Sequence, residues 1–466
     1  MTWHKRITFI VALLIAAFDI EARPKVGIVI IIDQFAYHEW QWLHKKAQYG
    51  FKTLRDKGVN FIDAHHLHGA PVTGAGHASI STNSLPYYHG IVNNEWYNNQ
   101  QQKVVCDKIE DRYCLNNLMI DTLNDQLMLQ NRQAHTYCIS LKPRASLLMA
   151  GRLGHAYWFE STGKEFKFNN ERATLTPYLQ EVAKRFDIDT SFAKSIASNK
   201  LLLDSGLETL KFAKQQQDQE PILIWLSLSA LDKVGHHDGP WNQNVHDMLL
   251  ALDKDIGEFI DQVEELYPSD EILWALSADH GVQPVVEEVQ EKGYTPSHRI
   301  IKEELVQKIQ DAVGAESEIQ VTGIRTPFVY LTNNNENNLD AIKNALKTIP
   351  GIVNVFSTHE LEINATHTYK ERLFKNQLYP GRTGQLVIEL APYVLMSDKK
   401  EGTKHNTPYD YNAHVPLIIR WDNHLEHSTQ AERVWAPQIS ATLAHLFGIP
   451  LPSASLFGIL PGISAE

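Results

Sequence analysis

Seven side chains of metal-binding or nucleophilic type lie beside apolar runs spread along the chain: Asp33, Thr73, Asp232, His236, Asp279, His280 and His414. Most of them follow or precede a run that is long enough for a buried strand. If a parallel sheet brought these positions to one edge, three carboxylates, three imidazoles and one hydroxyl would meet there. Such a set predicts a two-metal site for phosphoryl transfer.

Two pairs carry the mixed oxygen and nitrogen chemistry that suits zinc. Asp279 and His280 follow the run ILWALSA and precede a glycine, and Asp232 and His236 are four residues apart. The spacing of the second pair places both side chains on one side of a helical turn. His237 leaves open which imidazole binds, and turn formers, a helix cap and solvated histidines remain the alternative readings.

Asp33 and His414 are ambiguous when each is taken alone. Asp33 ends an apolar run that begins at Val26, so its strand should lie in the middle of a sheet, although a simple turn residue has the same pattern. His414 opens the run HVPLIIR after a polar segment, where a surface histidine would also be ordinary.

Thr73 is followed by Gly-Ala-Gly and by a segment that can be helical to about Thr82. The amino end of a helix offers unpaired amides and a positive dipole end, which favour an ionised hydroxyl and a bound phosphate. Metal coordination would further depress the pKa of that hydroxyl. The alternative is a threonine that only caps its helix.

Short, continuous apolar runs predict the strands that would position these residues, at 25–33, 134–141, 221–229, 271–278 and 415–420. Runs without alternation are typical of strands buried on both faces of a parallel sheet. Helices are expected from after Asp33 to about Asp56, after Thr73, and at 116–130, 241–267, 300–313, 338–348 and 435–447. The expected fold is α/β, with a doubly wound, mostly parallel central sheet flanked by helices.

Two long segments, at about 95–220 and 282–410, separate the expected core strands and look like insertions. Connections of that size inside a compact domain are usually functional or have structure of their own. We therefore expect cap insertions over the carboxyl ends of the strands, where ligands bind in open α/β sheets.

Composition and the first residues bound the class of protein. The chain has 466 residues, 43% of them hydrophobic, and a formal net charge of -12, which argues against a nucleic acid as an obligate partner. Residues 1–22 have the basic start, short apolar run and polar end of a secretory signal peptide, with an uncleaved anchor as the alternative. We expect one catalytic domain at 23–466, a periplasmic or secreted location, and no stable membrane insertion after cleavage. Cys106 and Cys114 could form a disulfide that closes a local loop, but the sequence cannot fix the pairing among Cys106, Cys114 and Cys138.

Taken together and in order, these motifs resemble the alkaline phosphatase superfamily. The resemblance is to the branch that holds type I phosphodiesterase/nucleotide pyrophosphatases and PafA-like bacterial alkaline phosphatases. It runs from about residue 24 to the C-terminus and is densest in VIIIDQF, PVTGAGHASISTNSLPYYHGIVNNEWY, SLKPR, LDKVGHHDGP, SADHGV and HVPLIIR. Gly-Ala-Gly-His after Thr73 departs from the usual Ala-Pro-Gly-His, and Lys233 and Val234 replace an aromatic and an aliphatic residue. These departures put fine substrate preference in doubt.

The resemblance implies an alkaline phosphatase-like fold, two zinc ions per chain and a threonine nucleophile. One zinc would be held by Asp232, His236 and His414, and the other by Asp33, Asp279 and His280 together with Thr73. Thr73 would form a phospho-threonine intermediate that water then hydrolyses. The matching positions also imply that Asn94 contacts phosphate and that Lys142 and Arg144 mark the monoesterase branch.

Three hypotheses about function follow, and the first two have a small-molecule phosphate ester as the substrate. The first is a secreted, zinc-dependent alkaline phosphatase, because Lys142 and Arg144 could neutralise a dianionic monoester. The second is a phosphodiesterase or nucleotide pyrophosphatase that uses the same site. The third is a non-catalytic phosphate- or metal-binding module. The physiological substrate and the oligomeric state are left open by the sequence.

Overall fold

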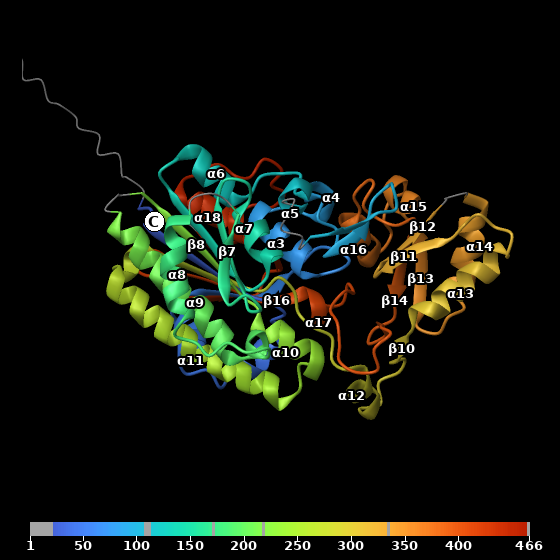
Figure 1. Ribbon diagram of the computed structural model, residues 1–466, viewed down its shortest axis with the longest axis horizontal. Coiled ribbons are helices and arrows are strands. Elements are labelled where there is room, and N and C mark those ends of the chain that lie inside the picture. Colours follow the sequence, from blue (N-terminus) through green and yellow to red (C-terminus); the bar gives the residue numbers. More distant parts are fainter. Residues whose placement is uncertain (1–21, 107–112, 170–172, 217–219, 333–335, 464–466) are drawn as a thin grey trace, which may run out of the picture.

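A ten-stranded sheet forms the centre of the protein in the computed structural model, which describes residues 22–106, 113–169, 173–216, 220–332 and 336–463 (Figure 1). The strand order is β17-β2-β16-β9-β1-β8-β5-β6-β7, with β18 paired to β2. The strands are β1 Val26–Ile32, β2 Val59–His65, β5 His135–Ser140, β6 His155–Glu160, β7 Glu165–Phe168, β8 Ile222–Leu228, β9 Ile272–Ser277, β16 His414–Trp421, β17 Ser428–Gln430 and β18 Val434–Trp435.

The middle of this sheet is parallel and buried. β1 pairs in parallel with β8 on one side and β9 on the other, so that Ile32 lies opposite Leu228 and Ile31 lies opposite Ser277. All seven residues of β1 are buried, as its continuous apolar sequence requires. The carboxyl ends of three strands therefore meet at one place.

Helices cover both faces of the sheet, which confirms the predicted doubly wound α/β fold. Around the sheet the helices are α1 Tyr37–Leu43, α2 Gly50–Lys57, α3 Thr73–Thr82, α4 Pro86–His89, α5 Tyr113–Asn117, α6 Leu123–Gln130, α7 Pro143–Ala150, α8 Thr176–Ala183, α9 Ile196–Gln215, α10 Ala230–Asp238, α11 Gln243–Leu266, α17 Asp410–Ala413 and α18 Gln438–Phe447. The apolar stripe predicted within 241–267 is the buried face of α11.

Two helices replace the one that was expected between Asp33 and Asp56. The reason is Asp253 on α11, whose carboxylate accepts hydrogen bonds from the backbone amides of Gln48, Tyr49 and Phe51 at 2.7–3.1 Å. These bonds hold the turn between α1 and α2 against α11. Gly50 allows the close approach, because a Cβ there would lie 2.5 Å from the backbone nitrogen of Gly257.

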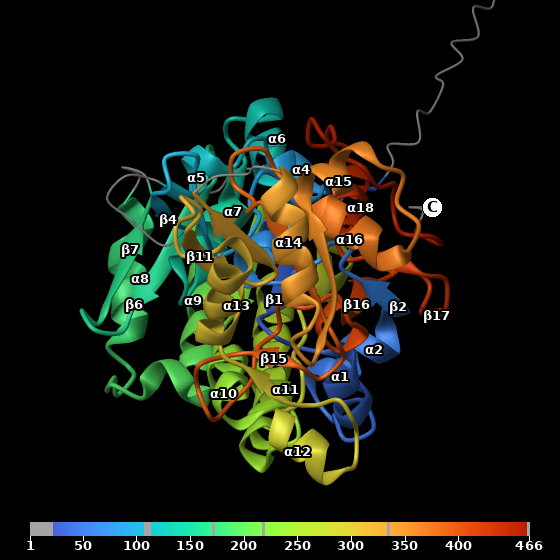
Figure 2. The ribbon, with the colours of Figure 1, turned by 90° about the vertical axis from the view of Figure 1, so that its right-hand side faces the viewer.

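The segment 282–410 forms a smaller lobe with its own sheet and its own apolar core (Figure 1, orange, right). Its antiparallel sheet has the order β11-β12-β14-β13. Its elements are α12 Val286–Glu291, β10 Arg299–Ile300, α13 Lys302–Val313, β11 Val321–Arg325, β12 Phe328–Leu331, α14 Glu336–Leu346, β13 Ile352–Ser357, α15 Thr358–Ile363, α16 Tyr369–Gln377, β14 Leu386–Leu390 and β15 Leu395–Met396. Figure 2, viewed from the side of this lobe, shows α13 and α14 in front of the central sheet.

The expectation that 95–220 is a cap insertion needs correction. This segment supplies β5, β6 and β7 to the central sheet and α7, α8 and α9 to its faces. Only its first part, with the hairpin of β3 Glu95–Tyr97 and β4 Lys103–Val105, lies toward the smaller lobe, where Glu95 forms an ion pair with Arg325. Polar connections around the short strand β6 concealed its place in the core.

Among the described residues, no helix combines the length and apolar character that crossing a bilayer requires. The predicted signal peptide lies outside the described residues except for Ala22.

Cys106 and Cys114 are joined by a disulfide, and Cys138 is a buried free thiol in β5. The bond ties the end of the β3–β4 hairpin to α5. Because the bond spans eight positions of the chain, it restricts the unfolded state over a short loop.

Replacing both Cys106 and Cys114 by alanine should lower the free energy of unfolding by about 2–3 kcal/mol, through the loop-closure entropy that the bond removes. Urea denaturation of the oxidised wild type and the double variant measures the difference. Reductant should destabilise the wild type to the same extent and leave the variant unchanged. A wild-type protein whose free energy of unfolding does not change with reductant would contradict the disulfide between Cys106 and Cys114.

Candidate active site

The candidate site lies at the carboxyl ends of the three central strands. Asp33 follows β1, Asp279 and His280 follow β9, and Asp232 lies in the first turn of α10, directly after β8. Asp33, Asp279 and His280 are fully buried, and Asp232 is nearly so. The strand order alone brings these four residues together, because β1 lies between β8 and β9.

Three histidines at this edge have the same hydrogen-bonding arrangement. The Nδ1 atoms of His236, His280 and His405 lie 2.8–3.0 Å from the backbone oxygens of Thr403, Gly281 and Pro71 respectively. A backbone oxygen only accepts, so each Nδ1 carries the proton and each Nε2 keeps its lone pair. This outer hydrogen bond is the one that metal-binding histidines make.

The free imidazole nitrogens converge on carboxylates. The Nε2 atoms of His236 and His405 are 3.2 Å apart, and Nε2 of His236 is also 3.2 Å from Asp232 Oδ1. Two lone pairs that face each other repel unless a cation lies between them. One atom each of Asp232, His236 and His405 lies within 4.8 Å of the others, which fits a metal site.

A second set lies beside the first and shares one carboxylate. Asp33, Asp232 and His280 also offer ligand atoms within 4.8 Å of one another, and Asp279 Oδ2 is 3.4 Å from His280 Nε2. Asp33 Oδ1 and His280 Nε2 are buried without a hydrogen-bond partner among the described residues, whereas Asp33 Oδ2 faces Lys142 and Asp279 Oδ2 faces His77. Buried polar atoms without partners are costly, so this donor set fits a second cation.

Burial keeps two of the imidazoles in the neutral form that binds metal. It lowers the pKa of His280, and together with His280 and His236 it lowers the pKa of His405 well below the ordinary value. Burial and the neighbouring charge of Asp279 raise the pKa of Asp33 well above its usual range. Burial also opposes ionisation of Asp232, but the positive charge of Lys142 outweighs it and holds the pKa of Asp232 well below the ordinary value.

Thr73 is the first residue of α3, and its side chain is buried at the edge of the same cluster. The cap position belongs to Val72, so the Thr73 hydroxyl does not cap the helix. α3 packs closely against the strand end, because a Cβ on Gly76 would lie 2.1 Å from the backbone oxygen of Asp279. Asn94 lies beside the helix start, where its Oδ1 accepts a bond of 2.7 Å from the amide of Gly74.

Lys142 and Arg144 reach the site from the start of α7. Lys142 Nζ is 2.5 Å from Asp33, 2.6 Å from Asp232 and 3.4 Å from Thr73 Oγ1. Pro143 begins α7, so the two cations project from the start of a helix. Arg144 and Asn94 both line the cavity beside the site.

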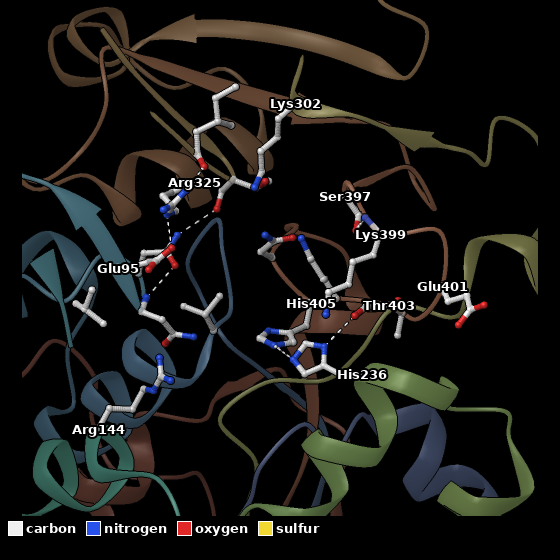
Figure 3. Close-up of a pocket in the computed structure, with 18 residues that line it drawn as sticks. Glu95, Arg144, His236, Lys302, Arg325, Ser397, Lys399, Glu401, Thr403 and His405 are labelled. Atoms are coloured by element: carbon white, nitrogen blue, oxygen red, sulfur yellow. Dashed lines mark hydrogen bonds and ion pairs between the residues drawn. The ribbon is translucent and has the colours of Figure 1, made fainter. Parts of the chain in front are cut away.

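This cavity has a volume of about 540 Å³ and opens between the central sheet and the smaller lobe. Figure 3 shows His236 and His405 at its base, Arg144 and Glu95 on one side, and Lys302 and Lys399 on the lobe. Burial and the positive charges of Lys302 and Lys399 lower the pKa of Lys404, which lines the same cavity. A small anionic molecule can therefore reach the clustered carboxylates and imidazoles from the side of the lobe.

Comparison with known proteins identifies the family. The family model of type I phosphodiesterase / nucleotide pyrophosphatase matches residues 27–415. The chain belongs to this family. The superfamily resemblance noted in the sequence is thereby confirmed.

Individual relatives of this phosphodiesterase family cover almost the whole chain. The chain is 25% identical to alkaline phosphatase PafA from Elizabethkingia meningoseptica, over 93% of each sequence. It is also 25% identical to alkaline phosphatase PhoV from Synechococcus elongatus, over 93% of this chain and 92% of that protein. A crystal structure of PafA superposes with a TM-score of 0.86 at 23% identity, over 95% of this chain and 99% of the other. Murine ectonucleotide pyrophosphatase/phosphodiesterase 5 superposes with a TM-score of 0.59 at 13% identity, over 91% and 95%.

In this member of the phosphodiesterase family, His414 does not lie with Asp232 and His236. The strand that it opens, β16, runs beside β2 and β9 and is separated from β8 by β9 and β1. His414 stacks between Tyr37 and His65, at ring-centroid distances of 3.8 and 4.3 Å, and its Nε2 bonds the backbone oxygen of Ile62. The prediction that His414 completes the first set therefore needs correction, because His405 occupies that place.

Three residues of the site were missed in the sequence. His405 lies in the polar segment 397–409, which returns from the smaller lobe to the central sheet and is called the return segment below. In the sequence, a histidine in such a segment looks like an ordinary surface residue. Gln34 has a φ of 72°, and this left-handed conformation lets its amides bond both Asp232 and Asp279. His77 connects the backbone oxygen of Thr73, Asp279 Oδ2 and Ser227. Of these three residues, only His77 lies in a recognisable motif, the sequence Gly-Ala-Gly-His that follows Thr73.

Proposed function

We propose that this protein is a zinc-dependent phosphate monoester hydrolase with a two-metal site and Thr73 as its nucleophile. The observation that carries the proposal is the meeting of two carboxylate and imidazole sets beside a buried threonine at a helix start. The names of PafA and PhoV, both alkaline phosphatases, support the same activity.

The donor sets fit two zinc ions. Asp232, His236 and His405 would hold one ion, and Asp33, Asp279 and His280 would hold the other, with Thr73 beside it. Mixed oxygen and nitrogen donors with fixed imidazole tautomers are typical of zinc. When bound, the two ions supply the positive charge that stabilises the attacking and leaving oxygens of an in-line displacement.

The protein's own residues orient the reaction. The Thr73 hydroxyl, at the positive end of the α3 dipole, attacks phosphorus and displaces the alcohol of the ester, which gives a phospho-threonine. Water then breaks the bond between phosphorus and the Thr73 oxygen, which releases phosphate and restores the hydroxyl. Asn94 lies at the same helix start, where its side-chain amide can donate to a nonbridging phosphate oxygen. His77 fixes the first turn of α3 relative to Asp279, so the hydroxyl and the carboxylates keep one geometry.

Lys142 and Arg144 favour a monoester over a diester. The terminal group of a monoester is a dianion, and two adjacent cations can each bond one of its free oxygens. A diester has one negative charge fewer and a bulky substituent where those cations lie. The diesterase reading remains the rival, because the family model and the murine phosphodiesterase belong to the same fold.

One experiment tests the proposed function as a whole. The purified protein should contain about two zinc ions per chain, and kcat/KM for phenyl phosphate should exceed that for methyl phenyl phosphate. Chelation should abolish turnover, and zinc should restore it. A protein that binds zinc but hydrolyses neither ester would be a binding module, and a preference for the diester would favour the rival.

Changing Lys142 and Arg144 together to alanine should lower kcat/KM for phenyl phosphate about a hundredfold, as expected for the loss of charge-assisted bonds to a dianion. Turnover of methyl phenyl phosphate should fall much less. Lys254→Ala is the matched control, because this exposed cation on α11 does not line the cavity. Equal losses for both esters would contradict the assignment of the pair.

The proposal includes export to the periplasm or the medium. The disulfide between Cys106 and Cys114 supports an oxidising compartment, where such bonds form and persist. Cell fractionation followed by an assay of each fraction tests this part separately from the activity.

A further inference from the structure

We propose that the cavity contains a second anion-binding subsite, formed by Lys302, Lys399 and Lys404, that selects phosphate monoesters whose leaving group carries its own negative charge. This inference rests on the proposed function and narrows its substrate class. The shared chemistry is a carboxylate or a second phosphate on the leaving group.

The cavity is cationic although the whole protein is acidic. Its lining includes five cationic side chains, Arg144, Lys302, Arg325, Lys399 and Lys404, and two carboxylates, Glu95 and Glu401, in a chain of net charge -12. Such a concentration of one sign in a cleft raises the local concentration of anionic molecules. The chemistry at phosphorus needs only Lys142 and Arg144, so the cations of the lobe are in excess.

Pairing within the fold leaves much of this charge available. Arg325 forms an ion pair with Glu95, and Lys302 forms an exposed pair with Asp398 at 3.4 Å. In the part of the chain that the structure describes, no ion pair joins Lys399 or Lys404 to a carboxylate. Nζ of Lys404 bonds only the backbone oxygen of Met396, at 3.2 Å. Exposed pairs are weak, so the Asp398 partner does not neutralise Lys302 fully.

The three lysines are held at fixed positions relative to the clustered histidines. Lys404 lies between Thr403, whose backbone exchanges bonds with His236, and His405. The β10–β15 pairing joins the segments that carry Lys302 and Lys399, and the backbone amide of Lys302 bonds Asp398 Oδ1 at 3.0 Å. The return segment 397–409 therefore connects Lys399 and Lys404 directly to the site, and the β10–β15 pairing holds the start of α13, with Lys302, beside them.

The position of the lysines corresponds to the leaving group. In an in-line displacement the leaving group departs on the side of phosphorus opposite the nucleophile. His236 and His405 line the cavity, whereas Thr73 lies buried behind it, so the leaving group extends into the cavity. Lys302 and Lys399 stand above that side of the site in Figure 3. A neutral leaving group would make no charged contact there.

The test compares esters that differ in one charge. The probes are meta-carboxyphenyl phosphate and its neutral isostere meta-carbamoylphenyl phosphate, with meta-phenylene bisphosphate as the phosphate arm. In the double variant Lys302→Met with Lys399→Met, the ratio of kcat/KM for the charged to the neutral ester should fall about tenfold, as expected for two partly exposed charge contacts. The charged ester whose kcat/KM ratio to the neutral ester decreases more in the double variant identifies carboxylate or phosphate as the preferred anion.

Lys400→Met provides the matched control, because Lys400 is exposed next to Lys399 but does not line the cavity. It should leave the ratio unchanged. An unchanged ratio in the double variant, or an equal fall with Lys400→Met, would overturn the subsite while the proposed function stands. A wild-type protein that hydrolyses none of these monoesters would overturn both. Thermal unfolding of each variant separates a change in the ratio from a loss of folded protein.

Discussion

Replacing Thr73 with alanine should lower kcat/KM for phenyl phosphate about 10⁴-fold or more, because the nucleophile of a covalent mechanism is removed. The fold should be preserved, since the side chain does not cap α3 and the start of the helix is fixed by other bonds. Among those bonds are the ones from Gly76 to Val72 and from Gly74 to Asn94. Zinc content and the binding of inorganic phosphate should therefore remain measurable in the variant.

Two further variants make the result specific to the hydroxyl of Thr73. Thr73→Ser keeps the hydroxyl and should retain activity within about tenfold. Thr82→Ala removes a hydroxyl from the other end of the same helix, where it bonds only Ala78, and should leave turnover intact. Acid quench during turnover should trap phosphate on the peptide that contains Thr73. Full activity in Thr73→Ala, or phosphate on another residue, would exclude this nucleophile.

The strands that are buried on both faces were predictable from sequence, because burial requires a continuous apolar run. Strands covered on both faces, such as β1 and β8, need apolar residues at every position, and such runs are visible in one sequence. β6 has the sequence HAYWFE with four buried residues, but its polar surroundings resembled an insertion. The division between the central sheet and the smaller lobe depends on long-range pairing, which no local pattern specifies.

The candidate site also has a part that was predictable from sequence and a part that was not. Asp33, Asp232, Asp279 and His280 follow apolar strands, so the order of adjacent parallel strands determines their meeting. His405 lies in a loop that returns from the smaller lobe, and its position depends on contacts with Thr403, Pro71 and His236 that are remote in sequence. His414 also begins a strand at this edge, but β9 and β1 lie between that strand and β8. The positions of the expected strands therefore could not show which of the two histidines joins Asp232 and His236.

Changing His405 to alanine should reduce the bound zinc from about two ions per chain to about one. It should also lower kcat/KM for phenyl phosphate about a thousandfold. Loss of an outer-shell partner alone typically costs 10- to 100-fold, so loss of a direct ligand should cost more. The remaining donors, Asp232 and His236, cannot complete a tetrahedral site. Metal analysis of protein dialysed against a low concentration of chelator measures the loss independently of activity.

His414→Phe is the matched comparison, because it removes an imidazole while keeping an aromatic ring between Tyr37 and His65. This variant should bind as much zinc as the wild type and retain its activity. Its expected cost is a small loss of stability from the missing bond to Ile62, of about 1 kcal/mol. The opposite pattern, with zinc lost from His414→Phe and kept in His405→Ala, would restore the ligand set that the sequence suggested. The two variants thus decide whether the segment that returns from the smaller lobe completes the metal site through His405.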